Sequence, residues 1–254
     1  MLAVHEAVAQ SRDDLVALHD RCVAFAHDNP KEGLERAKGW KEQGGGGFYA
    51  DHCIAMALYE LHDYAGAAQR FEALATATFS MPPLQRALTL DQAGQAWLAG
   101  HEPARAKAAL DAAIQLAGGK NADLFIDRAE ALADLSQYWD AIDDLNRAIE
   151  LAPDRADAYI YRGTAYRYVD SRELALEDIQ HGLSLAPDST MGLLERGNLR
   201  RLNGDIAGAQ QDWLRVTKLA PSSAEGKAAS VNLANLKGKG AGDKAPDAAA
   251  QKTQ

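Results

Sequence analysis

Leu151-Ala152-Pro153 is followed by the same tripeptide at Leu185-Ala186-Pro187 and again at Leu219-Ala220-Pro221, so each proline lies 34 residues after the last. A period of this length is typical of helix-turn-helix units that stack on one another. We therefore expect a repeat protein. Such a chain forms an extended surface rather than one enclosed pocket.

Other residues keep the same period. When the three prolines are counted as position 32 of a unit, positions 8 and 20 are small and positions 4 and 24 are large and apolar. Small residues recur where two helices must cross closely, so the pattern predicts tightly packed helix pairs. The residues are Ala129, Gly163 and Gly197 at position 8, Ala141, Ala175 and Ala209 at position 20, Phe125, Tyr159 and Leu193 at position 4, and Leu145, Ile179 and Trp213 at position 24.

This pattern resembles the tetratricopeptide repeat (TPR) family, and bacterial proteins of that family in particular. Units of the family show an aromatic residue or Leu at position 4, Gly or Ala at 8, a large residue at 11, Ala at 20, a large apolar residue at 24 and Pro at 32. The resemblance implies an all-α fold. We expect a right-handed α-solenoid of about six helix-turn-helix units with a C-terminal capping helix.

The frame extends over nearly the whole chain. Five units are expected at about 48–82, 83–121, 122–155, 156–189 and 190–221, preceded by a degenerate helix pair at 13–47 and a flexible N-terminus at 1–12. Ser222 and Ser223 favour a helix N-terminus, so we expect a capping helix over 222–236. The segment 237–254 lacks apolar periodicity and is expected to be disordered.

Composition excludes several function classes. The net charge is −9, with 27 basic and 36 acidic residues, which argues against binding to a phosphate backbone. No stretch approaches the roughly 20 apolar residues that span a bilayer, so we expect no membrane insertion. Ala7-Val8-Ala9 has the small residues of an export-signal cleavage site without the apolar core. The cytoplasm is the default location, and the periplasm follows if an export signal precedes the chain.

Cys22 and Cys53 are the two cysteines. In the repeat frame they lie on neighbouring first helices, near position 9 and at position 6. A disulfide requires Cα atoms within about 7 Å. An oxidising compartment favours the bridge and a reducing cytosol favours two buried thiols, so the sequence leaves both states open.

Arginine recurs at position 7 and aspartate at position 23. Each arginine can therefore pair with an aspartate of its own or the preceding unit. We expect a ladder of partly buried ion pairs with a structural role, because the matching acids neutralise any row of guanidiniums that could bind anions. The residues are Arg128, Arg162 and Arg196, with Asp144, Asp178 and Asp212.

The TPR resemblance implies a non-enzymatic scaffold that binds a peptide or helix of a partner protein in a concave groove, usually lined by positions 2, 5, 9 and 12 of each first helix. The expected groove changes from aromatic at its N-terminal end to acidic in the middle and basic at its C-terminal end. It would thus suit a partner with a basic and an acidic stretch. The candidate residues are Tyr49, His52, Met56, Tyr59, Asp91, Gln95, Ile126, Glu130, Ile160, Thr164, Arg167, Leu194, Asn198 and Arg201.

Alternative functions are less favoured. The family's carboxylate clamp needs lysine at position 5, and no unit supplies it. The seven histidines are scattered without the spacing of metal ligands, and we expect no catalytic residue, no bound metal and no cofactor. His52 and Met56 lie four residues apart and could hold a soft metal such as copper(I), although groove lining explains them better. The remaining alternative is a structural or self-associating assembly element, in which Tyr49 and Tyr59 would receive a second copy of the chain, so we expect a monomer or weak homo-oligomer.

Overall fold

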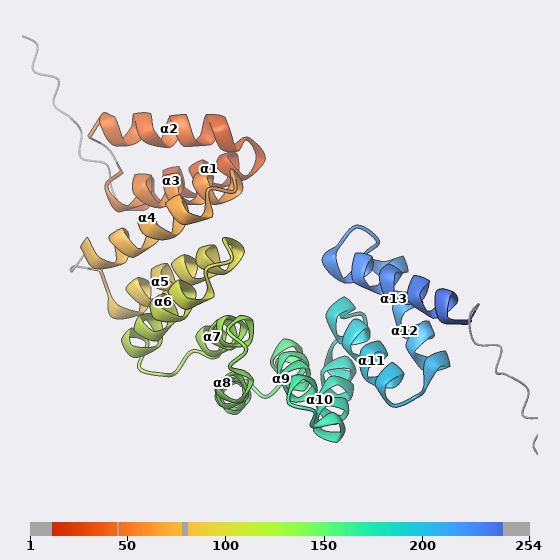
Figure 1. Cartoon of the computed structure of the whole chain (residues 1–254). Helices are drawn as coiled ribbons and strands as arrows, with labels where there is room; N and C mark the ends of the chain where they lie inside the picture. The colour runs from red at the N-terminus through yellow and green to blue at the C-terminus, as the bar shows by residue number, and fades with distance from the viewer. Residues whose placement is uncertain (1–11, 45, 78–80, 241–254) are drawn as a thin grey trace, which may run out of the picture. The chain divides into compact units, whose positions relative to one another are not determined.

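The computed structural model describes residues 12–44, 46–77 and 81–240, and this part of the chain forms thirteen α-helices and no strand (Figure 1). The first twelve helices form six consecutive pairs. The helices are α1 Arg12–Asp28, α2 Pro30–Glu42, α3 Phe48–Glu60, α4 Tyr64–Ala77, α5 Pro83–Ala99, α6 Pro103–Leu116, α7 Ala122–Asp134, α8 Tyr138–Leu151, α9 Ala156–Tyr168, α10 Arg172–Leu185, α11 Thr190–Leu202, α12 Ile206–Leu219 and α13 Ala224–Gly240.

Helix beginnings follow the sequence closely. Pro30 and Pro83 occupy the first position of α2 and α5, where the missing N–H removes no helical hydrogen bond. Ser189 caps α11, and the hydroxyl of Ser223 accepts a hydrogen bond from Gly226 N at 3.1 Å. The last helix, α13, begins at Ala224, directly after this serine.

The turn inside each helix pair repeats one backbone conformation. Position 15 has a positive φ in five pairs, at His62, His101, Ser136, Asp170 and Gly204, with values from 58° to 85°. The next residue then donates its N–H to a carbonyl five residues earlier, as Gln137 does to Leu132 at 2.8 Å. This hydrogen bond closes the end of the first helix and reverses the chain.

Close helix crossing explains the small residues at position 8. A Cβ added to Gly163 would lie 2.8 Å from Ile179 Cγ1 and 2.9 Å from the Ala175 carbonyl oxygen. At Gly197 it would lie 2.5 Å from the indole nitrogen of Trp213. Positions 8, 20 and 24 thus meet inside one pair, which confirms the crossing expected from the repeat frame.

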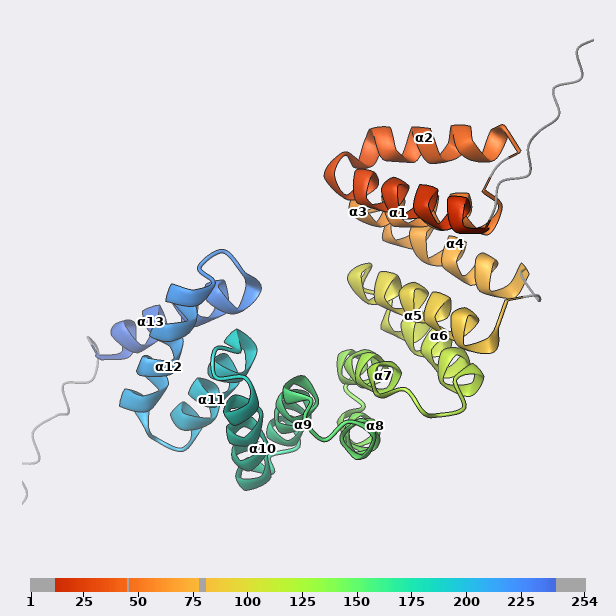
Figure 2. The ribbon, with the colours of Figure 1, turned by 180° about the vertical axis from the view of Figure 1, so that it is seen from behind.

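The chain divides into two compact units, residues 1–152 and 153–254. The N-terminal unit contains α1–α8, with α1 packed against α2 and α3 (Figure 2), and its largest core cluster includes Phe71, Trp97 and Leu110. The C-terminal unit contains α9–α13 and buries Ile179, Leu193 and Trp213. Each unit is thus a stack of helix pairs around its own core, and the all-α solenoid fold is confirmed.

The last helix covers part of the final pair. Ala229 of α13 lies in the same buried cluster as Trp213, whereas Leu214 remains 43% exposed. The helix continues to Gly240, so assigning 237–240 to the tail was wrong. A helix that is already nucleated and packed extends easily, since each added residue forms one more backbone hydrogen bond. Residues 241–254 and 1–11 lie outside the described residues, and Arg12 begins α1.

None of the helices in the described ranges is both long and apolar enough to cross a bilayer.

Candidate functional site

The arginine and aspartate ladder lies within the helix pairs, where each arginine contacts the aspartate 16 residues later. Arg162 donates from Nε and Nη2 to the two carboxylate oxygens of Asp178, at 2.7 and 2.8 Å. The hydrogen bond to Asp178 raises the pKa of Arg162. Arg128 binds Asp144 in the same two-point manner and also contacts Asp111 of the preceding unit at 2.7 Å.

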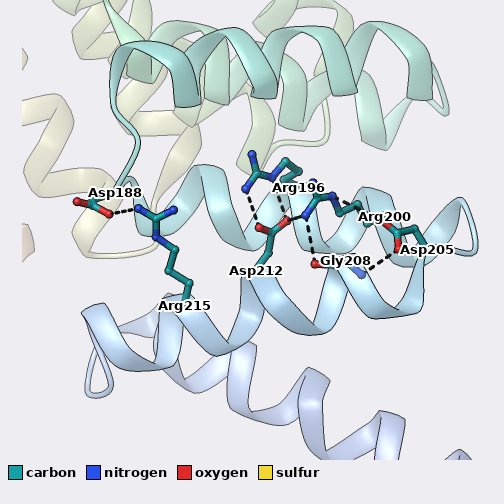
Figure 3. A network of polar contacts seen from close by, with 7 residues as sticks. All are labelled: Asp188, Arg196, Arg200, Asp205, Gly208, Asp212 and Arg215. Carbon is teal, nitrogen blue, oxygen red and sulfur yellow. Dashed lines mark hydrogen bonds and ion pairs between the residues drawn. The ribbon is translucent and has the colours of Figure 1, made fainter.

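The last ion pair of the ladder, between Arg196 and Asp212, includes a second arginine. In Figure 3, Arg196 and Arg200 both point to the carboxylate of Asp212, and Arg196 donates at 3.0 and 2.7 Å and Arg200 at 2.9 Å. Asp212 is only 4% exposed. Such a carboxylate requires a charged partner, so these arginines neutralise core acids and leave no row of free guanidiniums.

The first helices of the N-terminal unit are connected through polar side chains. His19 of α1 is hydrogen-bonded to His52 of α3 at 2.9 Å, and His52 Nε2 to the side-chain oxygen of Gln92 on α5 at 2.8 Å. The Gln92 amide then donates to the sulfur of Met56 at 3.8 Å. Burial lowers the pKa of His52 to about 4, so its ring is neutral at physiological pH.

This arrangement bears on the soft-metal alternative. His52 and Met56 are both held by Gln92, so a metal between them would have to displace that amide. Among the described residues, no three His, Cys, Asp or Glu side chains are grouped so that they could hold a metal ion. The geometry therefore favours lining of the surface over metal binding for His52 and Met56.

Cys22 and Cys53 are joined by a disulfide, with their Cα atoms 6.1 Å apart. The bond links α1 to α3 beside the His19–His52 contact. Cys53 is fully buried, and the bridge packs with Ala26 and Ile54. It therefore fixes α1 against α3 at this end of the unit.

An acidic cluster lies between α5 and α7. The Gln95 side-chain amide donates to Asp127 at 2.9 Å and to Asp91 at 3.4 Å. Asp91 is 9% exposed, and burial together with the charge of Asp127 raises its pKa to about 8. Glu130 lies one turn after Asp127 and is exposed, so this part of α7 presents two acidic side chains.

Two of the apolar candidates at position 5, Ile126 and Ile160, were wrong as surface residues. Ile126 is 4% and Ile160 2% exposed, and Ile160 would touch a Cβ at Gly182 of the neighbouring helix at 2.7 Å. An apolar side chain at this position turns into the helix crossing. Thr164 is partly exposed, but its hydroxyl donates to the backbone oxygen of Ile160 at 2.8 Å.

The basic end of the expected groove also differs. Arg167 donates to Glu195 at 2.6 Å and is half-buried, so its charge is already neutralised. Asn198 donates to the same Glu195 at 3.2 Å and accepts from Asn232 of α13 at 3.0 Å. Leu194 packs against the C-terminal core. Arg201 is exposed and is the predicted groove arginine that remains on the surface.

No family model matches the sequence, and no curated protein matches it either. Solved structures do match. A crystal structure of MamA is 22% identical and covers 65% of this chain and 94% of its own, with a TM-score of 0.54. MamA from Desulfovibrio magneticus RS-1 is 20% identical over 71% of this chain and 98% of its own, with a TM-score of 0.58. YrrB, described as a TPR protein with an unusual peptide-binding site, is 17% identical over 72% of this chain and 91% of its own, with a TM-score of 0.51.

The chain has the tetratricopeptide-repeat fold. The TPR frame also locates residues that the groove positions missed. His19, Gln92, Asp127 and Glu195 occupy position 6 or its equivalent in four different repeats, and each contacts a side chain of the next or preceding first helix. The available signal was a polar residue two places before the small residue of position 8, which recurs in most units.

Proposed function

We propose that this TPR protein is a non-enzymatic scaffold that binds a segment of a partner protein on the first-helix face of its N-terminal unit. We define this face by the partly exposed side chains His19, Tyr49, His52, Met56, Tyr59, Gln92, Gln95, Asp127 and Glu130, which lie on α1, α3, α5 and α7.

The observation that carries the proposal is the run of side-chain contacts between successive first helices. His19 to His52 to Gln92 joins α1, α3 and α5, and Gln95 to Asp127 joins α5 and α7. Four helices thus contribute to one connected surface. The residues on it differ from repeat to repeat, whereas the ladder and the core repeat with the period, so this surface is where a partner can be specified.

The chemistry of the face suits a polypeptide. Its N-terminal part is aromatic, with the rings of His19 and Tyr49 5.5 Å apart and those of Tyr59 and Tyr64 5.3 Å apart. Its other end carries the carboxylates of Asp127 and Glu130. Aromatic anchors beside a charged patch are typical of protein-binding surfaces. YrrB shares the fold and is described as having a peptide-binding site, although at 17% identity the likeness carries the fold alone.

The proposal assigns no catalytic step to the histidines. Both ring nitrogens of His52 are occupied, one by His19 and the other by Gln92, and its lowered pKa keeps the ring neutral. A general base needs a nitrogen that can reach the substrate proton. The pair therefore fits a positioning role that holds α1, α3 and α5 together.

Photo-crosslinking tests the proposal. A photoreactive amino acid replaces Gln95 on the first-helix face of the full chain, and in a matched variant it replaces Asp143, which is exposed on the second helix α8. Crosslinking in cells of the source organism is followed by mass spectrometry. Any captured protein is purified, and its affinity is measured for the unmodified chain and for Met56→Glu.

We expect a crosslink from position 95 and not from 143, and at least a tenfold loss of affinity in Met56→Glu, because a carboxylate would enter an apolar contact. Crosslinks from position 143 alone would contradict the proposal. The alternative is self-association. If the captured protein is a second copy of this chain and light scattering of the purified chain shows a dimer, the face is a self-association site.

A further inference from the structure

Asp91 is a buried carboxylate without a counter-charge. It lies on α5 and is 9% exposed, and its Oδ1 has no hydrogen-bond partner within the described part of the chain. Its other oxygen accepts one long hydrogen bond, 3.4 Å, from Gln95. Buried carboxylates are normally paired or fully hydrogen-bonded, so this oxygen requires an explanation.

The other buried aspartates of the molecule show what is missing. Asp144, Asp178 and Asp212 are each bound by an arginine of the same helix pair. Asp91 instead faces the acids of α7: burial raises its pKa most, and the charge of Asp127, a side-chain hydrogen bond with Asp127 and the charge of Asp123 raise it further. Two carboxyl groups can share a hydrogen bond only if one of them holds a proton, so near neutral pH this pair carries one negative charge, and a cation that binds there replaces the proton.

Within the described residues, basic side chains of the neighbouring helices have other partners: Arg70 of α4 binds Asp51, Arg86 of α5 donates to the Ala75 carbonyl oxygen, and Arg128 of α7 binds Asp111 and Asp144. On α4, Glu72 accepts a hydrogen bond from Trp97, and on α6 the guanidinium of Arg105 lies over the Trp97 ring. Lys107 of α6 is paired with Asp111. The charged groups around Asp91 are therefore acidic, and the cation that fits the site must come from outside the unit.

The site is reachable from the surface. Gln95 is exposed, and its amide NH₂ group points to Asp91 and Asp127, at 3.4 and 2.9 Å. Asp91 Oδ2 and Asp127 Oδ2 both accept hydrogen bonds from this amide, and the exposed Glu130 follows Asp127 by three residues on α7. Acceptors from two different helices converge there.

We propose that the cluster of Asp91, Gln95 and Asp127 binds the guanidinium group of an arginine in the partner segment, an inference that rests on the proposed function. A guanidinium is planar and has five N–H donors, so it can bind acceptors on two helices at once. It is less strongly hydrated than an ammonium group and enters a half-buried acidic site more readily than lysine. A metal ion fits less well, since the described residues contain no group of three His, Cys, Asp or Glu side chains that could hold one.

Binding of this kind has a proton signature. Burial and Asp127 raise the pKa of Asp91 to about 8, so near neutral pH the carboxyl holds a proton. A guanidinium favours the ionised form, and the proton is released to the buffer. Affinity for arginine is therefore expected to increase as pH rises from 6 to 8.

The test uses N-acetyl-arginine methylamide as the probe, with the lysine and citrulline derivatives as comparisons. Each is titrated into the full ¹⁵N-labelled chain and followed by NMR at the side-chain amide of Gln95. Citrulline has nearly the shape of arginine and no charge, so it isolates the charge. Asp91→Asn removes the acid, and Asp143→Asn on α8 makes the same charge change away from the cluster.

We expect the arginine probe to shift the Gln95 amide, with affinity at least tenfold above that of citrulline, above that of lysine, and higher at pH 8 than at pH 6. Asp91→Asn should weaken it at least tenfold and Asp143→Asn by less than twofold. Thermal melting checks folding, and Asp127→Asn replaces Asp91→Asn if that variant does not fold.

Equal binding of arginine and citrulline, or undiminished arginine binding in the folded Asp91 or Asp127 variant, would overturn the inference. The proposed function fails separately. A partner that crosslinks at position 95 but binds Asp91→Asn with full affinity leaves the scaffold proposal standing and removes the arginine site.

Discussion

Replacing Arg162 with alanine tests whether the ladder stabilises the fold. The substitution removes both hydrogen bonds to Asp178 and leaves its carboxylate without a cation. Asp178 is only 6% exposed. Breaking a fully buried pair destabilises a protein by about 3–5 kcal/mol. The Arg162 side chain is 19% exposed, so water can screen part of the loss, and we expect about 2–3 kcal/mol.

The structure also predicts an order among three variants. Arg196→Ala should be milder than Arg162→Ala, because Arg200 still binds Asp212 at 2.9 Å. Arg215→Ala is the matched control in the same unit. It removes an exposed pair with Asp188, visible at the edge of Figure 3, in which the side chains are 49% and 69% exposed. Exposed pairs contribute roughly 0–1 kcal/mol.

Urea unfolding followed by tryptophan fluorescence measures these differences in the free energy of unfolding. Trp213 is the tryptophan of the C-terminal unit and is fully buried, so its fluorescence should report the unfolding of that unit. For a domain of this size, about 2–3 kcal/mol corresponds to a fall in melting temperature on the order of 10 °C. Equal midpoints for Arg162→Ala and Arg215→Ala would refute the reasoning. The double variant Arg162→Met with Asp178→Leu should recover most of the stability, because no charge stays buried.

Three further predictions concern other sites. The wild type should lose free energy of unfolding as pH rises from 4 to 8, because the pKa of Asp91 is about 8 in the folded chain and the unfolded chain loses this proton at lower pH. Asp91→Asn has no such proton, so its free energy of unfolding should increase relative to the wild type over this range. Urea titrations at pH 5 and 8 measure the difference, and a difference that shrinks with pH would contradict the prediction. Ser136→Gly should stabilise by about 0.5–1 kcal/mol because φ is 60° there, and Gly204→Ala, at φ 85°, should destabilise by a similar amount in the same thermal assay. The unreduced protein should show no free thiol by mass spectrometry. Reduction should destabilise the N-terminal unit by about 3–4 kcal/mol, because the bridge joins residues 31 apart. Two free thiols in protein from its native compartment would exclude the bridge.

The repeat frame predicted what depends on local periodicity. Positions 8, 20 and 24 determine how the two helices of one pair cross, so Gly163, Ala175 and Ile179 meet as the sequence indicates. The offset of 16 residues between arginine and aspartate also lies within one pair, and it recurs in the ladder of the structure. These features need only the geometry of a single repeat.

The surface could be predicted less well, because a position number does not fix the rotation of a helix against its neighbour. Ile126 and Ile160 were assigned to the groove and lie in the core. Arg167 was assigned to the basic end of the groove, but it is bound by Glu195 of the next repeat. Apolar residues turn toward the core and charged residues toward an available partner, and both depend on the identity of residues about 30 positions away.

His19 was missed for the same reason. Its partner His52 lies 33 residues later, on a helix that the degenerate first repeat brings alongside. With Cys22 near position 9, His19 falls near position 6, which the groove positions 2, 5, 9 and 12 do not include. The contact between the two histidines is visible only once α1 is placed against α3.

Hydrogen exchange of the chain with its captured partner tests the central claim most directly. A partner bound on the first-helix face should slow exchange of backbone amides in α3, α5 and α7, because it stabilises these helices against local opening. The second helices α4, α6 and α8 should change little in comparison. Protection confined to the second helices would contradict the account.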